Sequence, residues 1–111
     1  MKVIYKYRLP FKEESKVIMP QGSTIIRVDG LDGALWLWAV VDPSLTLVER
    51  TFYLVKTGGE LPEDVYPEDY VGCGAIFIQM ELMMYVFEKP FTEKYVPDEP
   101  APFDWKTVQE D

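Results

Sequence analysis

Few residues in this chain have side chains that could do chemistry. The sequence contains no histidine and a single cysteine, Cys73. The absence of histidine excludes the Ser-His and Cys-His pairs that activate a nucleophile, and it excludes histidine as a metal ligand. Cys73 cannot form an intramolecular disulfide, and we expect it to be a small buried apolar residue rather than a reactive thiol. Catalysis would fall to carboxylates, tyrosine or lysine. The sequence therefore favours a protein that is not an enzyme and that uses no cofactor or metal ion.

Acidic residues gather in the second half of the chain. The net charge is −8, yet residues 1–56 carry eight basic against six acidic residues, whereas residues 57–111 carry three against thirteen. The stretch GELPEDVYPEDY has no basic residue, and a field of this sign repels nucleic acid and attracts a basic partner surface. A solvated loop is the alternative, and a cation site is disfavoured because the spacing lacks the alternating oxygen ligands of a calcium loop. The candidate partner-binding acids are Glu60, Glu63, Asp64, Glu68 and Asp69.

Two indoles stand in the run GALWLWAVVD, residues 33–42. Trp36 and Trp38 share one face of an extended chain, where they form either part of the core or a platform for stacking a base or a partner side chain. We expect Trp38 to be structural and retain Trp36 as a candidate binding residue. Gly72 and Gly74 leave one strand face bare, which admits a large neighbour. If their strand lies beside the tryptophan strand, that neighbour is the indole pair.

Alternation of apolar and polar residues predicts strands along most of the chain. In KVIYKYRL, residues 2–9, the alternation continues until Pro10. In STIIRVDG it places Ile26 and Val28 on one side and Ile25 and Arg27 on the other. The Asp/Gly pairs of DGLDG predict a tight hairpin into the tryptophan strand. A second hairpin is predicted over residues 70–88 with its turn near residues 79–81, and a short helix is the alternative there.

These strands and turns predict an all-β fold. We expect a small β-sandwich or barrel of six to seven mostly antiparallel strands. A single domain over residues 1–88 is followed by a Pro-rich acidic tail or arm over residues 89–111. No apolar stretch reaches the roughly 18–20 residues of a membrane span, and no signal peptide is evident at the start, so a soluble intracellular protein is expected.

Several short segments occur in an order that resembles a family of short uncharacterised proteins encoded by bacteriophages. The family pattern comprises a K-Y pair, a P-x-G-A turn, L-W-A, G-T-G, Y-I-G-T and a final V-x-H-V-F-E. These landmarks fall on Lys6–Tyr7, on Pro20, Gly22 and Ser23, on Leu37–Trp38–Ala39, on Thr57–Gly58, on Tyr70–Val71–Gly72–Cys73 and on Met84–Tyr85–Val86–Phe87–Glu88. Tyr85 replaces the family's frequent histidine and Cys73 its frequent threonine. The resemblance covers residues 1–88 and implies a phage origin without a defined activity.

The expected function is therefore binding. The leading hypothesis is a phage accessory protein in the host cytoplasm that binds a host protein with a basic surface, in the manner of an inhibitor of host defence. An alternative is a protein that sequesters a small nucleotide-like messenger between aromatic side chains and basic residues such as Lys6, Arg8 or Arg27. A virion or assembly component is a third hypothesis. Membrane association and direct nucleic-acid binding are not expected, and an edge strand at residues 2–9 or in SKVIMP could pair two copies.

Overall fold

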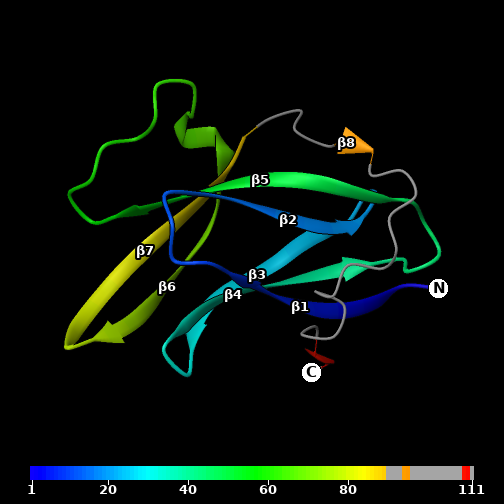
Figure 1. The fold of residues 1–111 in the computed structure, drawn as a ribbon, viewed down its shortest axis with the longest axis horizontal. Helices are drawn as coiled ribbons and strands as arrows, with labels where there is room; N and C mark the ends of the chain where they lie inside the picture. The colour runs from blue at the N-terminus through cyan, green and yellow to red at the C-terminus, as the bar shows by residue number, and fades with distance from the viewer. Residues whose placement is uncertain (90–93, 96–108, 111) are drawn as a thin grey trace.

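Antiparallel strands make up most of the structure, a computed structural model that describes residues 1–89, 94–95 and 109–110. The first sheet has the order β3-β4-β1-β9, and the second has the order β2-β5-β7-β6 with β8 beside β5 (Figure 1). The predicted all-β fold is thereby confirmed, and of the two predicted forms, sandwich or barrel, the two sheets make a sandwich. The elements are β1 (Val3–Leu9), β2 (Glu14–Pro20), β3 (Thr24–Leu31), β4 (Ala34–Val41), β5 (Leu47–Lys56), the 3-10 turn η1 (Pro67–Asp69), β6 (Tyr70–Ile78), β7 (Met80–Glu88), β8 (Lys94–Tyr95) and β9 (Gln109–Glu110).

The C-terminal tail predicted at residues 89–111 lies mostly outside the described residues, and its separation from the domain stays a prediction. None of the helices in the described part of the chain is long and apolar enough to cross a membrane.

Both predicted hairpins are present, and local backbone geometry explains each turn. Leu31 pairs with Ala34, so only Asp32 and Gly33 connect β3 to β4. Their φ angles are 54° and 76°, which is the pair of left-handed residues that a type I′ hairpin turn requires. In the second hairpin Ile78 pairs with Met80 around Gln79, whose φ is 70°. Residues 80–88 accordingly form strand β7, and the helical alternative is wrong.

The core lies between the two sheets and is built from alternate residues of their central strands. Tryptophan-bearing β4 is a central strand of the first sheet, with β3 and β1 as its neighbours. It directs Leu35, Leu37, Ala39 and Val41 into the core. The side chains that meet them from the other strands include Tyr7, Leu9, Val17, Met19, Phe52, Leu54, Met84 and Val86. The indoles of β4 therefore lie on its opposite face, outside the layer between the sheets.

A β-bulge changes the faces of β3 from those predicted by strict alternation. Ile25 pairs with Ala39 and Arg27 pairs with Trp38, which leaves Ile26 as the extra residue. Ile25 and Val28 both pack on the core, while Ile26 is exposed. The predicted grouping of Ile25 with Arg27 is therefore wrong, because the bulge reverses the alternation between them.

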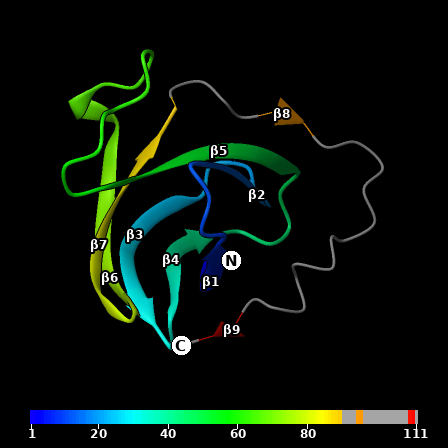
Figure 2. The same cartoon turned by 60° about the vertical axis from the view of Figure 1, so that its left-hand side comes forward.

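The bare glycine face of β6 lies against β3 and not against the indoles. Figure 2 shows β3 running beside the β6–β7 hairpin. A methyl group on Gly72 would lie 2.9 Å from Cγ2 of Val28, and one on Gly74 would lie 2.7 Å from Cα of Asp29. A methyl group on Gly30 would overlap the carbonyl oxygen of Ala75. These glycines allow the two sheets to approach each other backbone to backbone along one side of the sandwich.

Candidate functional site

Basic and aromatic side chains form two rows across the outer face of the first sheet. Strand pairing places Arg27 and Lys6 on either side of Trp38 in one row. In the next row Asp29 and Arg8 flank Trp36. Residues opposite one another on neighbouring antiparallel strands share a face, so these side chains emerge on one surface. We call this surface the tryptophan face, and it consists of Lys6, Arg8, Arg27, Asp29, Trp36 and Trp38.

Two cations of the tryptophan face, Lys6 and Arg27, lie over its indole rings. Nζ of Lys6 is 4.8 Å from the ring centroid of Trp36 and 5.8 Å from that of Trp38. Cζ of Arg27 is 4.5 Å from the centroid of Trp38. A cation within about 6 Å of an indole is attracted by the negative face of the ring. Basic side chains from both neighbouring strands therefore contact the ring of Trp38.

The two indoles differ in their accessibility and in their hydrogen bonds. Trp38 and Lys6 are each only 5% exposed, whereas Trp36 is half-buried. Nε1 of Trp36 donates to the carbonyl oxygen of Leu31 at 3.3 Å. Nε1 of Trp38 is buried and has no hydrogen-bond partner among the residues that the structure describes. The prediction that Trp38 is the more buried indole is confirmed, and Lys6 and Arg27 contact its ring on the outer face.

Arg27 is held in place by an acidic neighbour on the same strand. Its Nη2 donates to Oδ2 of Asp29 at 2.6 Å, and Oδ1 of Asp29 accepts from the backbone N–H of Gly30 at 2.8 Å. The hydrogen bond from Arg27, followed by that from Gly30, lowers the pKa of Asp29 below its ordinary value. Asp29 therefore stays charged at neutral pH. The side chain of Arg27 is still 59% exposed, so it can turn towards an anion in solution.

The predicted acidic residues lie elsewhere, on the loop between β5 and β6. This loop covers the outer face of the second sheet, where Val65 packs with Tyr53 and Phe87. The carboxylate of Asp64 lies 2.7 Å from Nζ of Lys89, an ion pair that lowers the pKa of Asp64 and raises that of Lys89. These contacts fix the loop against the sheet.

The acids of the loop do not converge on one point. Oδ2 of Asp69 accepts from the backbone N–H of Tyr66 at 2.9 Å and closes the turn at η1. Glu60, Glu63 and Glu68 are exposed. Within the residues that the structure describes, no three acidic or cysteine side chains are grouped so that they could hold a metal ion. Asp64 and Asp69 thus stabilise the loop, and the three glutamates point into solvent.

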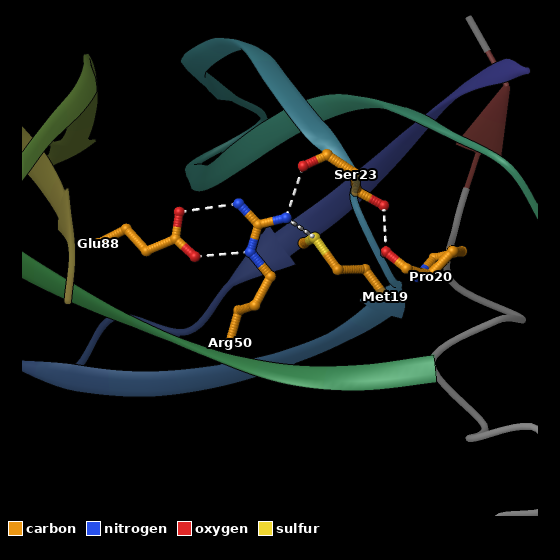
Figure 3. Close-up of polar contacts among 5 residues, drawn as sticks. All are labelled: Met19, Pro20, Ser23, Arg50 and Glu88. Carbon is orange, nitrogen blue, oxygen red and sulfur yellow. Dashed lines mark hydrogen bonds and ion pairs between the residues drawn. The ribbon is translucent and has the colours of Figure 1, made fainter. Parts of the chain in front are cut away.

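A buried polar cluster around Arg50 is absent from the residues singled out by the sequence. Nε and Nη2 of Arg50 donate to the two carboxylate oxygens of Glu88 at 2.6 and 2.8 Å (Figure 3). Nη1 of Arg50 donates to the carbonyl oxygen of Ser23 at 2.6 Å, and the hydroxyl of Ser23 donates to the carbonyl oxygen of Pro20 at 2.6 Å. The cluster joins β5 and β7 to the connection between β2 and β3.

The Arg50 cluster gives a structural reason for two of the sequence landmarks. Pro20 and Ser23 belong to the turn landmark, and Glu88 ends the last landmark. Ser23 and Glu88 bind Arg50 directly and Pro20 binds Ser23, whereas Arg50 itself is not in a landmark. The signal available in the sequence was an arginine on the otherwise apolar side of residues 45–55, because a charged residue on a buried face needs a buried partner.

Comparison with known proteins gives one family. A family model described as "Domain of unknown function (DUF7352)" matches residues 1–96. Comparisons with curated proteins and with solved structures give no match.

Proposed function

The chain belongs to the family described as Domain of unknown function (DUF7352), and from its structure we propose that it is a non-enzymatic binding protein for a small nucleotide-like ligand. The observation that carries the proposal is the grouping of Lys6, Arg8 and Arg27 around two indoles on one sheet face. The resemblance to phage proteins supports a role in the host cytoplasm, where such a ligand would be a signalling molecule withdrawn from the host.

The chemistry of the tryptophan face fits a ligand that is both aromatic and anionic. Trp36 keeps part of its ring accessible, and stacking a base on an aromatic side chain is worth about 1–3 kcal/mol. Arg8 is exposed beside it, and Arg27 stands on the far side of Trp38. Arginine offers paired donors that match the oxygens of a phosphate. The net charge of −8 disfavours a nucleic-acid polymer, so a small ligand is the better fit.

A thermal-shift titration with cyclic nucleotides tests this proposal. A ligand at a hundred times its dissociation constant adds about 2.7 kcal/mol to the free energy of unfolding, which raises the midpoint measurably. Trp36→Leu and Arg8→Ala should each reduce the rise, whereas Lys16→Ala, which removes an exposed lysine on β2, should not. Nucleosides and inorganic phosphate, tested alone, separate the stacking contribution from the charge contribution. An unchanged midpoint at millimolar nucleotide would rule the proposal out.

A second candidate function is supported by the fixed acidic loop. Because Val65 and the Asp64–Lys89 pair hold this loop, Glu60, Glu63 and Glu68 are presented outwards in a set arrangement that suits a basic host protein. A basic host protein captured through these glutamates should bind in a salt-sensitive way in a pull-down from host lysate. Replacing the three glutamates by glutamine should abolish its capture. Lys16→Ala serves again as the control, and undiminished capture by the glutamine variant would exclude this surface.

A further inference from the structure

An apolar strip runs from the tip of the β6–β7 hairpin towards the core. Ile78 and Met80 pair across the turn and are 48% and 64% exposed. Because side chains alternate along a strand, Leu82 and Met84 continue the same face of β7. Figure 1 shows the turn of this hairpin projecting beyond the neighbouring strands. We call Ile78, Met80, Leu82 and Met84 the hairpin strip. Ile78 and Met80 are exposed, Leu82 is half-buried and Met84 reaches the core. An exposed apolar surface such as that of the first two is typical of an interaction site.

The inner end of the hairpin strip opens into a cavity of about 620 Å³. Leu82 and Met84 belong both to the hairpin strip and to the lining of the cavity, and buried Leu54 lines the cavity from β5. Phe11 lines it from the connection between β1 and β2 and Leu61 from the loop after β5, and both are exposed. The molecule thus carries an exposed apolar projection beside a cavity that has apolar side chains on part of its wall.

The charges around the cavity favour a second copy of this chain as the occupant. Lys12 and Lys56 line the cavity together with Glu13 and Glu60, and all four are exposed. In the described part of the chain none of the four forms an ion pair with another side chain. Residues 70–80 carry no charge at all. In a chain of net charge −8 the charges of the cavity lining balance. When the tip of an identical hairpin enters the cavity, exposed Glu81, which follows Met80, can meet Lys12 or Lys56.

We propose that the hairpin strip and the cavity form the interface of a twofold-symmetric dimer, in which the tip of each hairpin enters the cavity of the other copy. Met80 lies four residues from Met84, about 13 Å along the strand at roughly 3.3 Å per residue. Projection and cavity are therefore neighbours on one surface, which permits a closed reciprocal contact instead of an open chain. This surface is separate from the tryptophan face, and the dimer goes beyond the proposed ligand binding.

Sedimentation velocity of the full chain over a range of concentrations tests the dimer. The wild-type protein should approach twice the monomer mass as its concentration rises. Met80→Asp replaces the apolar side chain at the tip by a carboxylate that would face Leu54, Leu82 and Met84 in the cavity. It should weaken association by at least about tenfold, since each factor of ten corresponds to roughly 1.4 kcal/mol. Leu45→Asp adds the same charge at an exposed leucine in the turn after β4 and should change nothing. A wild-type monomer at every concentration, or equal effects of the two variants, would overturn the proposal.

A mixing experiment separates the two halves of the contact. Leu82→Trp narrows the cavity but keeps Met80, whereas Met80→Asp keeps the cavity but loses the apolar tip. Each variant alone should be largely monomeric, and the mixture should form a heterodimer through the one intact tip and the one intact cavity. Circular dichroism checks the fold, and Phe11→Asp at the cavity mouth replaces Leu82→Trp if that variant unfolds. A mixture that associates no better than its two components would show that tip and cavity are not partners.

Discussion

Tyr7 is a titratable residue that lies in the core, on the inner face of β1. Burial raises the pKa of its phenol well above the ordinary value, and the nearby phenol of Tyr5 raises it further. The centroids of these two rings are 6.5 Å apart. The folded protein therefore keeps Tyr7 neutral under alkaline conditions in which an unfolded chain would ionise it.

This difference predicts an alkaline loss of stability that depends on Tyr7. The unfolded chain loses the tyrosine proton near pH 10, so the contribution of Tyr7 is complete below about pH 10 and is lost as the pH rises further. One such group changes the free energy of unfolding by at most about 1.4 kcal/mol per pH unit. Urea unfolding at pH 8 and near pH 11 should show a smaller loss for Tyr7→Phe than for the wild type. Tyr66→Phe, at an exposed tyrosine, is the control, and equal losses in all three proteins would contradict the prediction.

The roles of Trp36 and Trp38 depend on neighbours that are distant in the sequence. Their spacing predicts that they share a face, and the structure confirms it. It does not predict that Lys6 and Arg27 cover Trp38, because this requires the register of three strands. The basic residues suggested for ligand binding were available from the sequence, but their grouping on one surface is a property of the sheet.

At the scale of the element, strands and turns were predictable where local chemistry determines them. Alternation predicts β1 and β5, and Asp32–Gly33 predicts the first hairpin. The bulge at Ile26 was not predictable, because it arises from the packing of β3 against the core. Ile25 and Val28 both pack there, which needs one extra residue between them, and Arg27 turns outwards as a consequence. The segment that lies against Gly72 and Gly74 could not be predicted from the sequence either, since it depends on how the sheets pack.

The crossing of β3 and β6 predicts a strong effect of one methyl group. Gly74→Ala would place Cβ 2.7 Å from Cα of Asp29, and backbone atoms cannot move aside as a flexible side chain can. We expect a loss of about 1–3 kcal/mol in the free energy of unfolding, the range for an overpacked core. Cys73→Ala at the adjacent position should cost less, because Cys73 points to the other face of β6. Chemical denaturation measures both, and equal stability of Gly74→Ala and wild type would mean that the strands do not approach so closely.

The Arg50 cluster predicts that two ion pairs of similar length differ in their contribution to stability. Glu88→Ala leaves the buried guanidinium of Arg50 without its carboxylate, and removing one partner of a buried pair costs about 3 kcal/mol or more. Lys89→Ala removes the exposed pair with Asp64 and should have a much smaller effect. The double variant Arg50→Met with Glu88→Leu should lose less than the sum of the single variants, because it removes both charges together. Additive losses would show that the two side chains act independently.

At the scale of the whole molecule, charge and apolar surface are distributed unevenly over the sandwich. Basic residues gather on the outer face of the first sheet, and acidic residues on the loop that covers the second. The neutral hairpin strip and its cavity lie apart from both. The sequence predicts the charge asymmetry, but not the cavity, which is formed by segments that are far apart along the chain. Each surface therefore suits a different partner.

Separate surfaces predict that ligand binding and dimerisation are independent. No residue of the tryptophan face belongs to the hairpin strip or to the cavity. A ligand bound to the tryptophan face therefore makes the same contacts in the monomer and in the dimer. Met80→Asp should therefore keep the full nucleotide-dependent rise in melting midpoint, and Trp36→Leu should keep the wild-type dimer dissociation constant. Coupling between two sites is reciprocal, so either variant can reveal it. If nucleotide shifts the sedimentation profile of the wild type, then the two surfaces are coupled, and the β3–β6 crossing is one contact between the sheets that can be tested for carrying the coupling.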